Sequence, residues 1–269
     1  FADVKLNEPE CIRYDAAHKR YLISNINGGS RQLDNNGFIT AVSAKGGSKK
    51  WIVAGQNGAK LNAPKGIEVQ GGKLYVADIH HLRIFSLDNG KPLASIKVDG
   101  ATMLNDLAVA KDGTVYVTDT GSSNKPGAIY KVTSNHKVSA IAKGPKLKGP
   151  DGITFDAKGH LVVVSFRGKK VLTMTTGGKI LKTKALMVGK LDGVMALKDG
   201  TIFVSSWKGR LVVEISPKGE VTTVLTNVPQ PACFMVDEAH HALLVPQVRA
   251  SKIAVAQLPH LKPLANKAQ

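Results

Sequence analysis

The chain has 269 residues, of which 43% are hydrophobic and 5% aromatic, and 37 Lys and Arg against 20 Asp and Glu give a formal net charge of +17. No apolar run approaches the roughly 18 residues of a membrane-spanning helix, so we expect no membrane insertion. A nucleic-acid binder is expected to gather its basic residues into stretches with aromatic residues between them, whereas the lysines here are scattered. We therefore expect no nucleic-acid partner and interpret the lysines as a solubilising shell, with attraction to an anionic ligand or surface as the alternative.

The sequence contains six weakened copies of one unit, in which a turn leads into a strand. The copies begin at Pro9, Pro64, Leu104, Pro150, Leu191 and Pro231. Their second residues stand at positions 10, 65, 105, 151, 192 and 232, so the spacings are 55, 40, 46, 41 and 40 residues. A period of about 40 residues is that of a four-stranded propeller blade.

Each copy is followed by a second run that is rich in β-branched residues. These runs lie at 21–23, 74–76, 115–117, 161–164, 202–204 and 243–245. Short β-rich runs separated by Gly, Asn and Asp indicate strands and hairpins, and no stretch has a convincing helical period. The sequence therefore predicts an all-β fold, a six-bladed β-propeller with four-stranded blades.

In chain order the blades are predicted at residues 9–55, 64–98, 104–143, 149–186, 190–227 and 230–258, all within a single domain over 1–269. The sixth copy lacks one strand, and residues 1–8 resemble a lone strand. We expect this N-terminal strand to complete the last blade and close the ring, which removes an exposed sheet edge. Residues 261–269 have lost the pattern and are predicted to be a loosely held tail.

The two cysteines occupy the same repeat position, Cys11 in the first copy and Cys233 in the last. A closed ring makes these copies neighbours, so a disulfide is one interpretation. Two separate buried cysteines are slightly favoured, because Cα atoms on inner strands can be too far apart to bridge. The chain starts at Phe1 without a Met, so we expect a periplasmic or secreted protein whose signal peptide has been removed, although an artificial boundary would look the same.

The second residues of the six copies should surround one mouth of the central channel. They are Glu10, Lys65, Asn105, Asp151, Asp192 and Ala232. Three carboxylates and one carboxamide in a narrow channel favour a divalent cation between them, and oxygen ligands suit calcium, magnesium or manganese better than zinc. Lys65 is the competing cation. The alternative is that these residues only form turns.

The loops that follow the second strands should point at the same mouth. They hold Asn25, Asn27, Asp78, His80, His81, Asp119, Thr120, Phe166, Arg167, Trp207 and Gln247. His80 and His81 are either bases or solvated residues. Phe166 and Trp207 either form apolar walls for a ligand or pack between blades, and Arg167 either attracts an anionic group or lies in solvent.

The six copies, and especially residues 104–119, resemble the gluconolactonase and senescence-marker-protein (regucalcin) family of six-bladed propellers, with paraoxonases and strictosidine synthases as more distant relatives. The resemblance implies a divalent cation held by Glu10, Asn105, Asp151 and Asp192. Asp151 departs from the family, which has Asn there; Asp keeps the ligand oxygen and adds a negative charge. Met103 stands where hydrolytic members tend to have an Arg that helps to hold a sugar lactone.

The resemblance implies a metal-dependent hydrolase of a lactone or other small ester. Its one divalent cation would be calcium, with magnesium, manganese or zinc as alternatives, and would polarise the ester carbonyl while a base activates water. Asp192 is the first candidate for that base, and His80 and His81 are the second. Lys65, Phe166, Arg167 and Trp207 would contact the substrate. The rivals are a non-catalytic propeller with a structural cation, which binds a small molecule or a protein, and a metal-free scaffold for an acidic partner.

Overall fold

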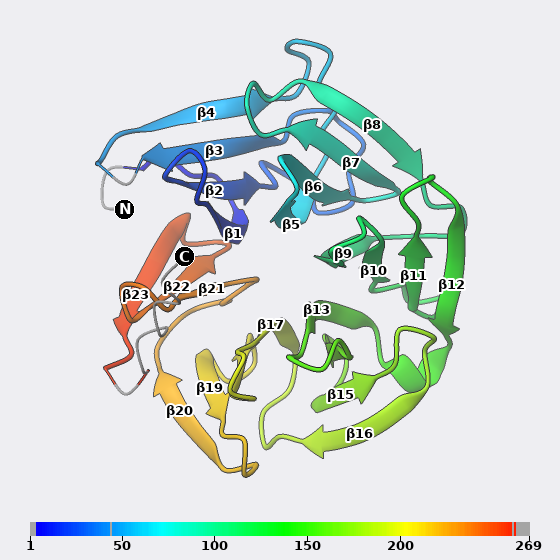
Figure 1. Ribbon diagram of the computed structural model, residues 1–269, viewed down its shortest axis with the longest axis vertical. Coiled ribbons are helices and arrows are strands. Elements are labelled where there is room, and N and C mark those ends of the chain that lie inside the picture. The colour runs from blue at the N-terminus through cyan, green and yellow to red at the C-terminus, as the bar shows by residue number, and fades with distance from the viewer. Residues whose placement is uncertain (1–3, 44, 260, 262–269) are drawn as a thin grey trace.

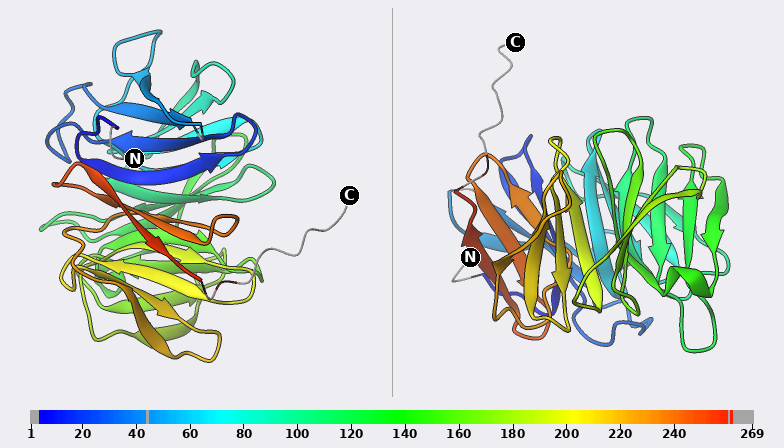
Figure 2. Two further views of the ribbon diagram at one scale, coloured as in Figure 1. Left: turned by 90° about the vertical axis from the view of Figure 1, so that its left-hand side faces the viewer. Right: turned by 90° about the horizontal axis from the view of Figure 1, so that it is seen from below.

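The computed structural model describes residues 4–43, 45–259 and 261. Six antiparallel sheets follow one another around a central axis, in chain order (Figure 1). This arrangement confirms the predicted six-bladed β-propeller. Edge-on views show the strands running through the thickness of the ring, so that the turns lie on its two faces (Figure 2).

The first three sheets have four strands each. The first contains β1 (Pro9–Asp15), β2 (Arg20–Asn25), β3 (Phe38–Ser43) and β4 (Ser48–Val53). The second contains β5 (Pro64–Gln70), β6 (Lys73–Asp78), β7 (His81–Ser86) and β8 (Pro92–Lys97). The third contains β9 (Leu104–Val109), β10 (Val115–Asp119), β11 (Ala128–Val132) and β12 (Val138–Lys143), and a short 3₁₀ helix, η1 (Pro145–Leu147), leads to the fourth.

The fourth and fifth sheets also have four strands, and the last has three among the described residues. The fourth contains β13 (Pro150–Phe155), β14 (Leu161–Ser165), β15 (Lys170–Met174) and β16 (Ile180–Ala185). The fifth contains β17 (Leu191–Ala196), β18 (Ile202–Ser206), β19 (Leu211–Ile215) and β20 (Val221–Leu225). The sixth contains β21 (Met235–Asp237), β22 (Ala242–Gln247) and β23 (Lys252–Gln257).

Burial decreases from the first strand of a blade, at the channel, to the fourth, at the rim. In the third blade, all but the last residue of β9 are buried, whereas β12 has none that is fully buried. The turn between β9 and β10 follows from its sequence, because Gly113 takes a φ of 81° and the Asp112 carboxylate accepts a hydrogen bond from the Thr114 amide. Asp-Gly supplies both features, so the hairpin forms where the sequence predicts a turn.

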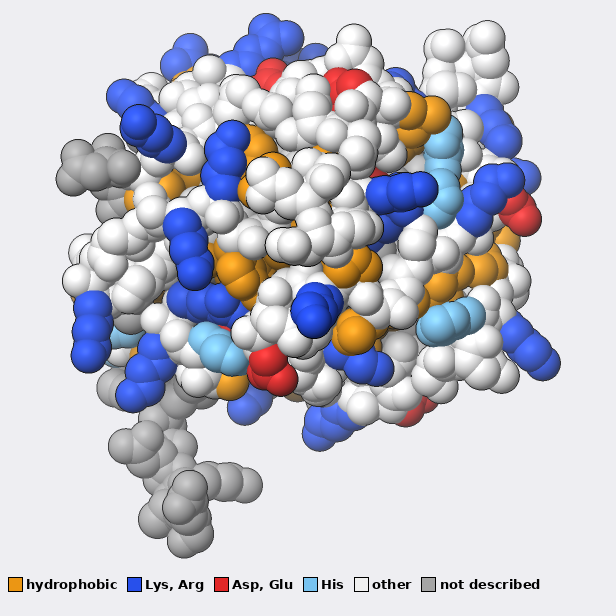
Figure 3. Space-filling model, turned by 90° about the horizontal axis from the view of Figure 1, so that it is seen from above, with side chains coloured by type: hydrophobic (Ala, Val, Ile, Leu, Met, Phe, Trp, Pro, Cys, Tyr) orange, Lys and Arg blue, Asp and Glu red, His pale blue; other side chains and the backbone are white. Residues whose placement is uncertain are grey.

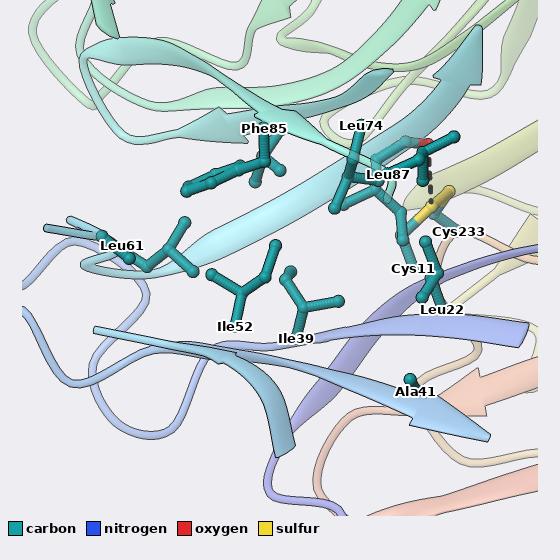
Figure 4. Close-up of a cluster of buried hydrophobic side chains, with 13 residues drawn as sticks. Cys11, Leu22, Ile39, Ala41, Ile52, Leu61, Leu74, Phe85, Leu87 and Cys233 are labelled. Carbon is teal, nitrogen blue, oxygen red and sulfur yellow. Dashed lines mark hydrogen bonds between the residues drawn. A yellow bond between two sulfur atoms is a disulfide. The ribbon is translucent and has the colours of Figure 1, made fainter. Parts of the chain in front are cut away.

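Apolar side chains of neighbouring blades pack face to face. Between the first and second blades, Leu22, Ile39 and Ile52 meet Leu74 and Phe85 (Figure 4). Similar clusters lie between the other blades. The core is therefore a ring of interfaces, each made by two sheets.

Cys11 and Cys233 close the ring at its inner edge. Their Cα atoms are 4.5 Å apart and a disulfide joins them, as Figure 4 shows. The slight preference for two separate cysteines was wrong, because the closed ring brings the first and last copies side by side, with a parallel bridge between these two residues.

The N-terminal segment does not form the predicted strand. Residues 4–8 belong to no strand, and residues 1–3 lie outside the described residues. Val4 and Leu6 instead pack their side chains on a cluster between the last and first blades, which includes Ile12 and Leu244. The predicted tail, 261–269, lies outside the described residues except for Leu261, which is buried.

Basic side chains are scattered over the outer surface on one side of the ring (Figure 3). Figure 3 shows Lys and Arg spread over the side of the ring that contains the outer strands β4 and β8. Among the described residues, no helix has the length and apolar character needed to cross a membrane.

Candidate metal and ligand site

Five of the six aligned side chains meet at one end of the channel. Glu10, Lys65, Asn105, Asp151 and Asp192 all line one cavity of about 550 Å³, and each is at most 6% exposed. The sixth, Ala232, is also buried but does not line this cavity. The structure thus brings together every residue that the sequence predicts to hold a metal, with Lys65 among them.

A β-bulge in the inner strand directs these side chains to the cavity. In the fourth blade Pro150 pairs with Ser165 and Ile153 pairs with Val163, so two residues of β13 lie opposite one residue of β14. The first, second, third and fifth blades shift register at the same place. Bulges re-aim side chains, and this one recurs in the first five copies, whose second residues face the channel mouth.

Asp106 lies beside the disulfide, and these three residues form a layer one position further along the chain than the aligned residues Glu10, Asn105 and Ala232. Asp106, Cys11 and Cys233 have polar or sulfur atoms within 4.8 Å of one another, and all three are buried. Asp106 accepts hydrogen bonds from the amides of Leu107 and Ile153, and burial raises its pKa to about 6. Metals bind thiolates rather than disulfide sulfurs, so this layer is structural.

Buried polar atoms without a hydrogen-bond partner gather on the cavity. Six such side-chain atoms exist among the described residues, and five of them belong to cavity-lining residues. The five are Glu10 Oε2, Asn105 Oδ1, Asp192 Oδ1, Trp207 Nε1 and Gln230 Oε1, although the Trp207 side chain lies close enough to Asp192 to lower the pKa of that carboxyl. Buried polar groups are nearly always hydrogen-bonded, and unsatisfied ones call for an ion, a water or a function. The cavity is therefore the part of the described chain that is best prepared for a ligand.

Asn105 is oriented so that its oxygen is available. Its Nδ2 donates to Thr120 Oγ1 at 3.1 Å, which leaves Oδ1 as the unsatisfied atom. Thr120 Oγ1 in turn lies 3.1 Å from the Pro150 carbonyl oxygen and 3.5 Å from Asp151 Oδ2. Thr120 thus fixes the amide with its acceptor free.

The three carboxyl groups of the cavity are hard to ionise. Burial raises the pKa of Glu10, Asp151 and Asp192 well above their ordinary values, and each is raised further by another carboxylate of the group. Lys65 opposes this shift at Glu10 and Asp151. A bound cation would favour the ionised forms.

Lys65 is held by backbone carbonyls rather than by a direct ion pair. Its Nζ donates to the carbonyl oxygens of Ser30 at 2.8 Å and Ala63 at 3.0 Å. Burial lowers its pKa to about 8. The one cationic side chain of the carboxylate ring is therefore itself weakly basic.

The donor set fits a hard divalent cation, with one geometric condition. Glu10, Asp151, Asp192 and Asn105 offer oxygens only, which suits calcium or magnesium. Among the described residues, however, the only three acidic, Cys or His side chains with atoms all within 4.8 Å of one another are Cys11, Asp106 and Cys233. The three carboxylates of the cavity would therefore have to draw closer to contact one ion together.

Two aromatic side chains and one basic side chain line the cavity together. Phe166 and Trp207 meet edge to face with ring centroids 5.1 Å apart, so they pack across the fourth and fifth blades and also line the cavity. Arg167 Nη2 donates to the Thr120 carbonyl oxygen at 2.6 Å. All three residues lie where the sequence places them.

His80 and His81 are not among the residues that line this cavity. His81 begins β7 and pairs with Asp78 and Lys97 in the sheet, and burial lowers its pKa. Asp78 accepts hydrogen bonds from the amides of Asn62 and Ala63 and from Arg83. His81 is therefore part of the sheet of the second blade rather than of a loop over the channel.

The other polar residues of the predicted loops serve the backbone. Asp119 accepts hydrogen bonds from the amides of Thr102, Met103 and Gly121. Asn25 is fully buried and donates to Ile23 and Thr40. Asn27 lies outside the cavity and donates to the Asn36 carbonyl oxygen, and Gln247 pairs with Lys252 in the last blade.

Sequence reasoning missed Gln230 and Glu8, which both line the cavity. Each residue directly precedes a repeat copy and has a positive φ, 48° for Gln230 and 51° for Glu8. The signal was available, because Gly149, at the same place in the fourth copy, also has a positive φ of 67°. The position before the copy therefore also faces the mouth in the first, third and sixth copies, where Glu8, Met103 and Gln230 line the cavity.

The fold is shared with known enzymes, although no protein-family profile and no curated protein matches the sequence. A gluconolactonase from Xanthomonas campestris is 17% identical, with 95% of this chain and 87% of that chain covered and a TM-score of 0.73. A luciferin-regenerating enzyme is 14% identical, with 97% and 94% covered and a TM-score of 0.72. Virginiamycin B lyase from Staphylococcus aureus is 14% identical, with 95% and 98% covered and a TM-score of 0.66.

These likenesses define the class of the protein as a six-bladed β-propeller. At these identities they show a common fold and leave the activity to be argued from the site. The neighbours include a lactonase and a lyase by name, so the same ring supports more than one reaction.

Proposed function

We propose that this protein is a divalent-metal-dependent hydrolase that acts on a lactone or another small ester. The observation that carries the proposal is the convergence of five unsatisfied buried polar atoms on one cavity that also holds three carboxylates. The gluconolactonase neighbour supports the substrate class. Met103 lines the cavity, so there is no Arg at that position to hold a sugar lactone.

Glu10, Asn105, Asp151 and Asp192 would hold the cation, with calcium as the first candidate and magnesium, manganese or zinc as alternatives. When bound, it would polarise the ester carbonyl and stabilise the negative charge that develops on the carbonyl oxygen. Asp151 adds a negative charge to the donor set, which favours binding of the cation and lowers its Lewis acidity.

Asp192 is the proposed general base. Its Oδ1 is unsatisfied and belongs to a cavity-lining residue, and once the cation holds this carboxyl in its ionised form it could accept a proton from water. His80 and His81 are not proposed, because they do not line the cavity. Trp207 Nε1 and Gln230 Oε1 supply one donor and one acceptor with which to orient a substrate, and Phe166 excludes water from one side.

A non-catalytic propeller with a structural cation is the second candidate. Two observations on the described residues favour it, namely that the carboxylates are not all within 4.8 Å of one another and that no His among these residues lines the cavity. In either case we place the protein in the periplasm or outside the cell, because a disulfide requires an oxidising compartment.

The test combines metal content with turnover. Metal bound to the native protein is measured by mass spectrometry, for the parent, Asp192→Asn and the control Asp199→Asn, which alters an exposed Asp in a turn. A panel of lactones and esters is then assayed with calcium, magnesium, manganese, zinc or chelator. We expect one equivalent of metal and metal-dependent hydrolysis in the parent and the control, with both lost in Asp192→Asn.

The other outcomes separate the candidates. One equivalent of metal without turnover of any ester would support the structural cation and overturn the hydrolase. No metal, together with melting curves that do not respond to chelator, would overturn both.

A further inference from the structure

A second cavity, of about 660 Å³, lies beside the channel between the fourth and fifth blades. It is formed by the loops that precede β13 and β17 and those that follow β14 and β18, so it opens on the same face as the channel mouth. Its basic residues are Arg167 and six lysines, and no Asp or Glu of the described residues lines it. The lysines are Lys146, Lys148, Lys169, Lys170, Lys190 and Lys208. We call it the basic cavity.

The charges of the basic cavity are not neutralised within the described chain. None of the seven residues forms an ion pair with an Asp or Glu of the described residues. The six lysines and Arg167 are all exposed to solvent. Like charges around a concave surface reinforce one another and attract anions.

The backbone beneath these side chains is held in place. The Arg167 amide donates to the Lys148 carbonyl oxygen at 3.0 Å, and the Trp207 amide donates to that of Lys190 at 3.0 Å. The Lys190 amide in turn donates to the Gly168 carbonyl oxygen at 3.2 Å, which joins the two blades. The lysines therefore extend from a fixed frame.

The floor of the basic cavity is apolar. Leu147 and Leu172 are 5% and 6% exposed, and Phe166 lies beside them. An inorganic anion would leave these side chains unused, and a single acidic group would leave most of the lysines without a partner. Lysines bind as point charges and do not demand the bidentate geometry of Arg, so carboxylate, sulfate and phosphate are all accepted.

We propose that the basic cavity binds an organic molecule that carries several acidic groups. Phe166 and Arg167 line both this cavity and the channel cavity, so one ligand can reach from one to the other. The substrate is then an anionic ester or lactone whose acidic groups lie among the lysines while its ester group lies in the channel. This last step rests on the proposed hydrolase, whereas the binding of an anion does not.

The test is calorimetry at low salt with three soluble probes. They are tetragalacturonate, which carries carboxylates, a heparin tetrasaccharide, which carries sulfates, and uncharged maltotetraose. The variant Lys169→Ala/Lys170→Ala/Lys208→Ala removes three cavity charges. The control Lys111→Ala/Lys137→Ala/Lys158→Ala removes three exposed lysines from turns on the opposite face, so both variants have the same net charge.

We expect at least one anionic probe to bind the parent and maltotetraose not to bind. The cavity variant should bind that probe about tenfold more weakly, because each exposed ion pair contributes a factor of about two. The control should stay within about twofold of the parent. Equal weakening of the two variants would show a general charge effect and overturn the proposal.

Two further outcomes would also overturn it. One is the absence of binding of either anionic probe. The other, measured with vesicles of phosphatidylglycerol as a fourth probe in the same titration, is binding only to the vesicles, which would point to a membrane surface. Failure of the hydrolase proposal is distinguishable, because it would show as anion binding without ester turnover, with the cavity variant still losing the anion.

Discussion

Cys11 and Cys233 stand 222 positions apart in the sequence, and their Cα atoms lie 4.5 Å apart, joined by a disulfide. They belong to the first and last repeat copies. Residues 4–8 add no strand to the last blade, so the covalent bond and the side-chain packing around it close the ring there.

The first prediction concerns this closure. Cys11→Ala/Cys233→Ala should lower the free energy of unfolding by up to about 5 kcal/mol, because a bond across so long a loop removes much of the entropy of the unfolded chain. Denaturant unfolding, followed by circular dichroism, measures the change. The parent unfolded in reductant is the control and should resemble the variant. A variant as stable as the oxidised parent would show that the disulfide does not stabilise the ring.

The second prediction is a pH dependence of stability in chelator. The pKa of Glu10, Asp151 and Asp192 is raised in the folded state, so folding favours their protonated forms. Their contribution is fully present below their unfolded pKa of about 4 and is lost as the pH rises through the folded values. Asp106, with a pKa of about 6, acts in the same direction. The melting temperature in chelator should therefore fall as the pH rises above about 4.

Melting curves at a series of pH values test this. Asp192→Asn removes one titrating group and should flatten the fall, while Asp199→Asn, in an exposed turn, should not. Saturating calcium should flatten it in the parent, because a bound cation stabilises the ionised carboxylates. Parallel curves for the parent and Asp192→Asn would contradict the assignment of the shift to the cavity.

The repeat allowed the ring and the residues at its mouth to be predicted from the sequence. It did not allow contacts between segments that are far apart in the sequence to be predicted. Asp151 and Asp192 could be placed together because the same bulge recurs at one position in five of the six copies. The separation of Cys11 and Cys233 depends on how the ring closes, which no local pattern states. The basic cavity was missed because its lysines come from four loops, each of which looks like ordinary solvated chain.

His80 and His81 show why the position of loop residues could not be predicted from the repeat. The topology placed the end of β6 at the mouth, but the direction of the next few residues depends on backbone angles. Ile79 has a φ of 52°, and His81 already pairs with Asp78 as the next strand begins. The tight turn leaves no loop to extend over the channel.

The third prediction concerns the repeat glycines. A Cβ on Gly152 would lie 2.2 Å from the Asp192 carbonyl oxygen, because the inner strands of the fourth and fifth blades approach closely there. Gly152→Ala should therefore cost at least about 2 kcal/mol of stability, since the obstacle is backbone. Gly177→Ala is the control, because its nearest neighbour would be a Thr175 hydroxyl at 3.7 Å. Denaturant unfolding of both variants measures the difference, and equal stabilities would show that the strands can separate without cost.

The fourth prediction concerns Lys65, which is 2% exposed in the ring that holds Glu10, Asp151 and Asp192. A cation in the channel would be repelled by its ammonium group, and the lowered pKa of about 8 leaves that group mostly protonated at pH 7. Lys65→Met keeps much of the side-chain length and removes the charge. It should therefore strengthen calcium binding by at least about tenfold, or ~1.4 kcal/mol.

Calorimetric titration with calcium at pH 7 measures this affinity, with Lys60→Met as a control at an exposed position. Without calcium, Lys65→Met should melt at a lower temperature than the parent, because the substitution removes the positive charge that opposes the raised pKa of Glu10 and Asp151. Calcium should remove this difference in melting temperature. Unchanged affinity in Lys65→Met would mean that the lysine and the cation do not compete, and would move the cation away from the Lys65 side of the mouth.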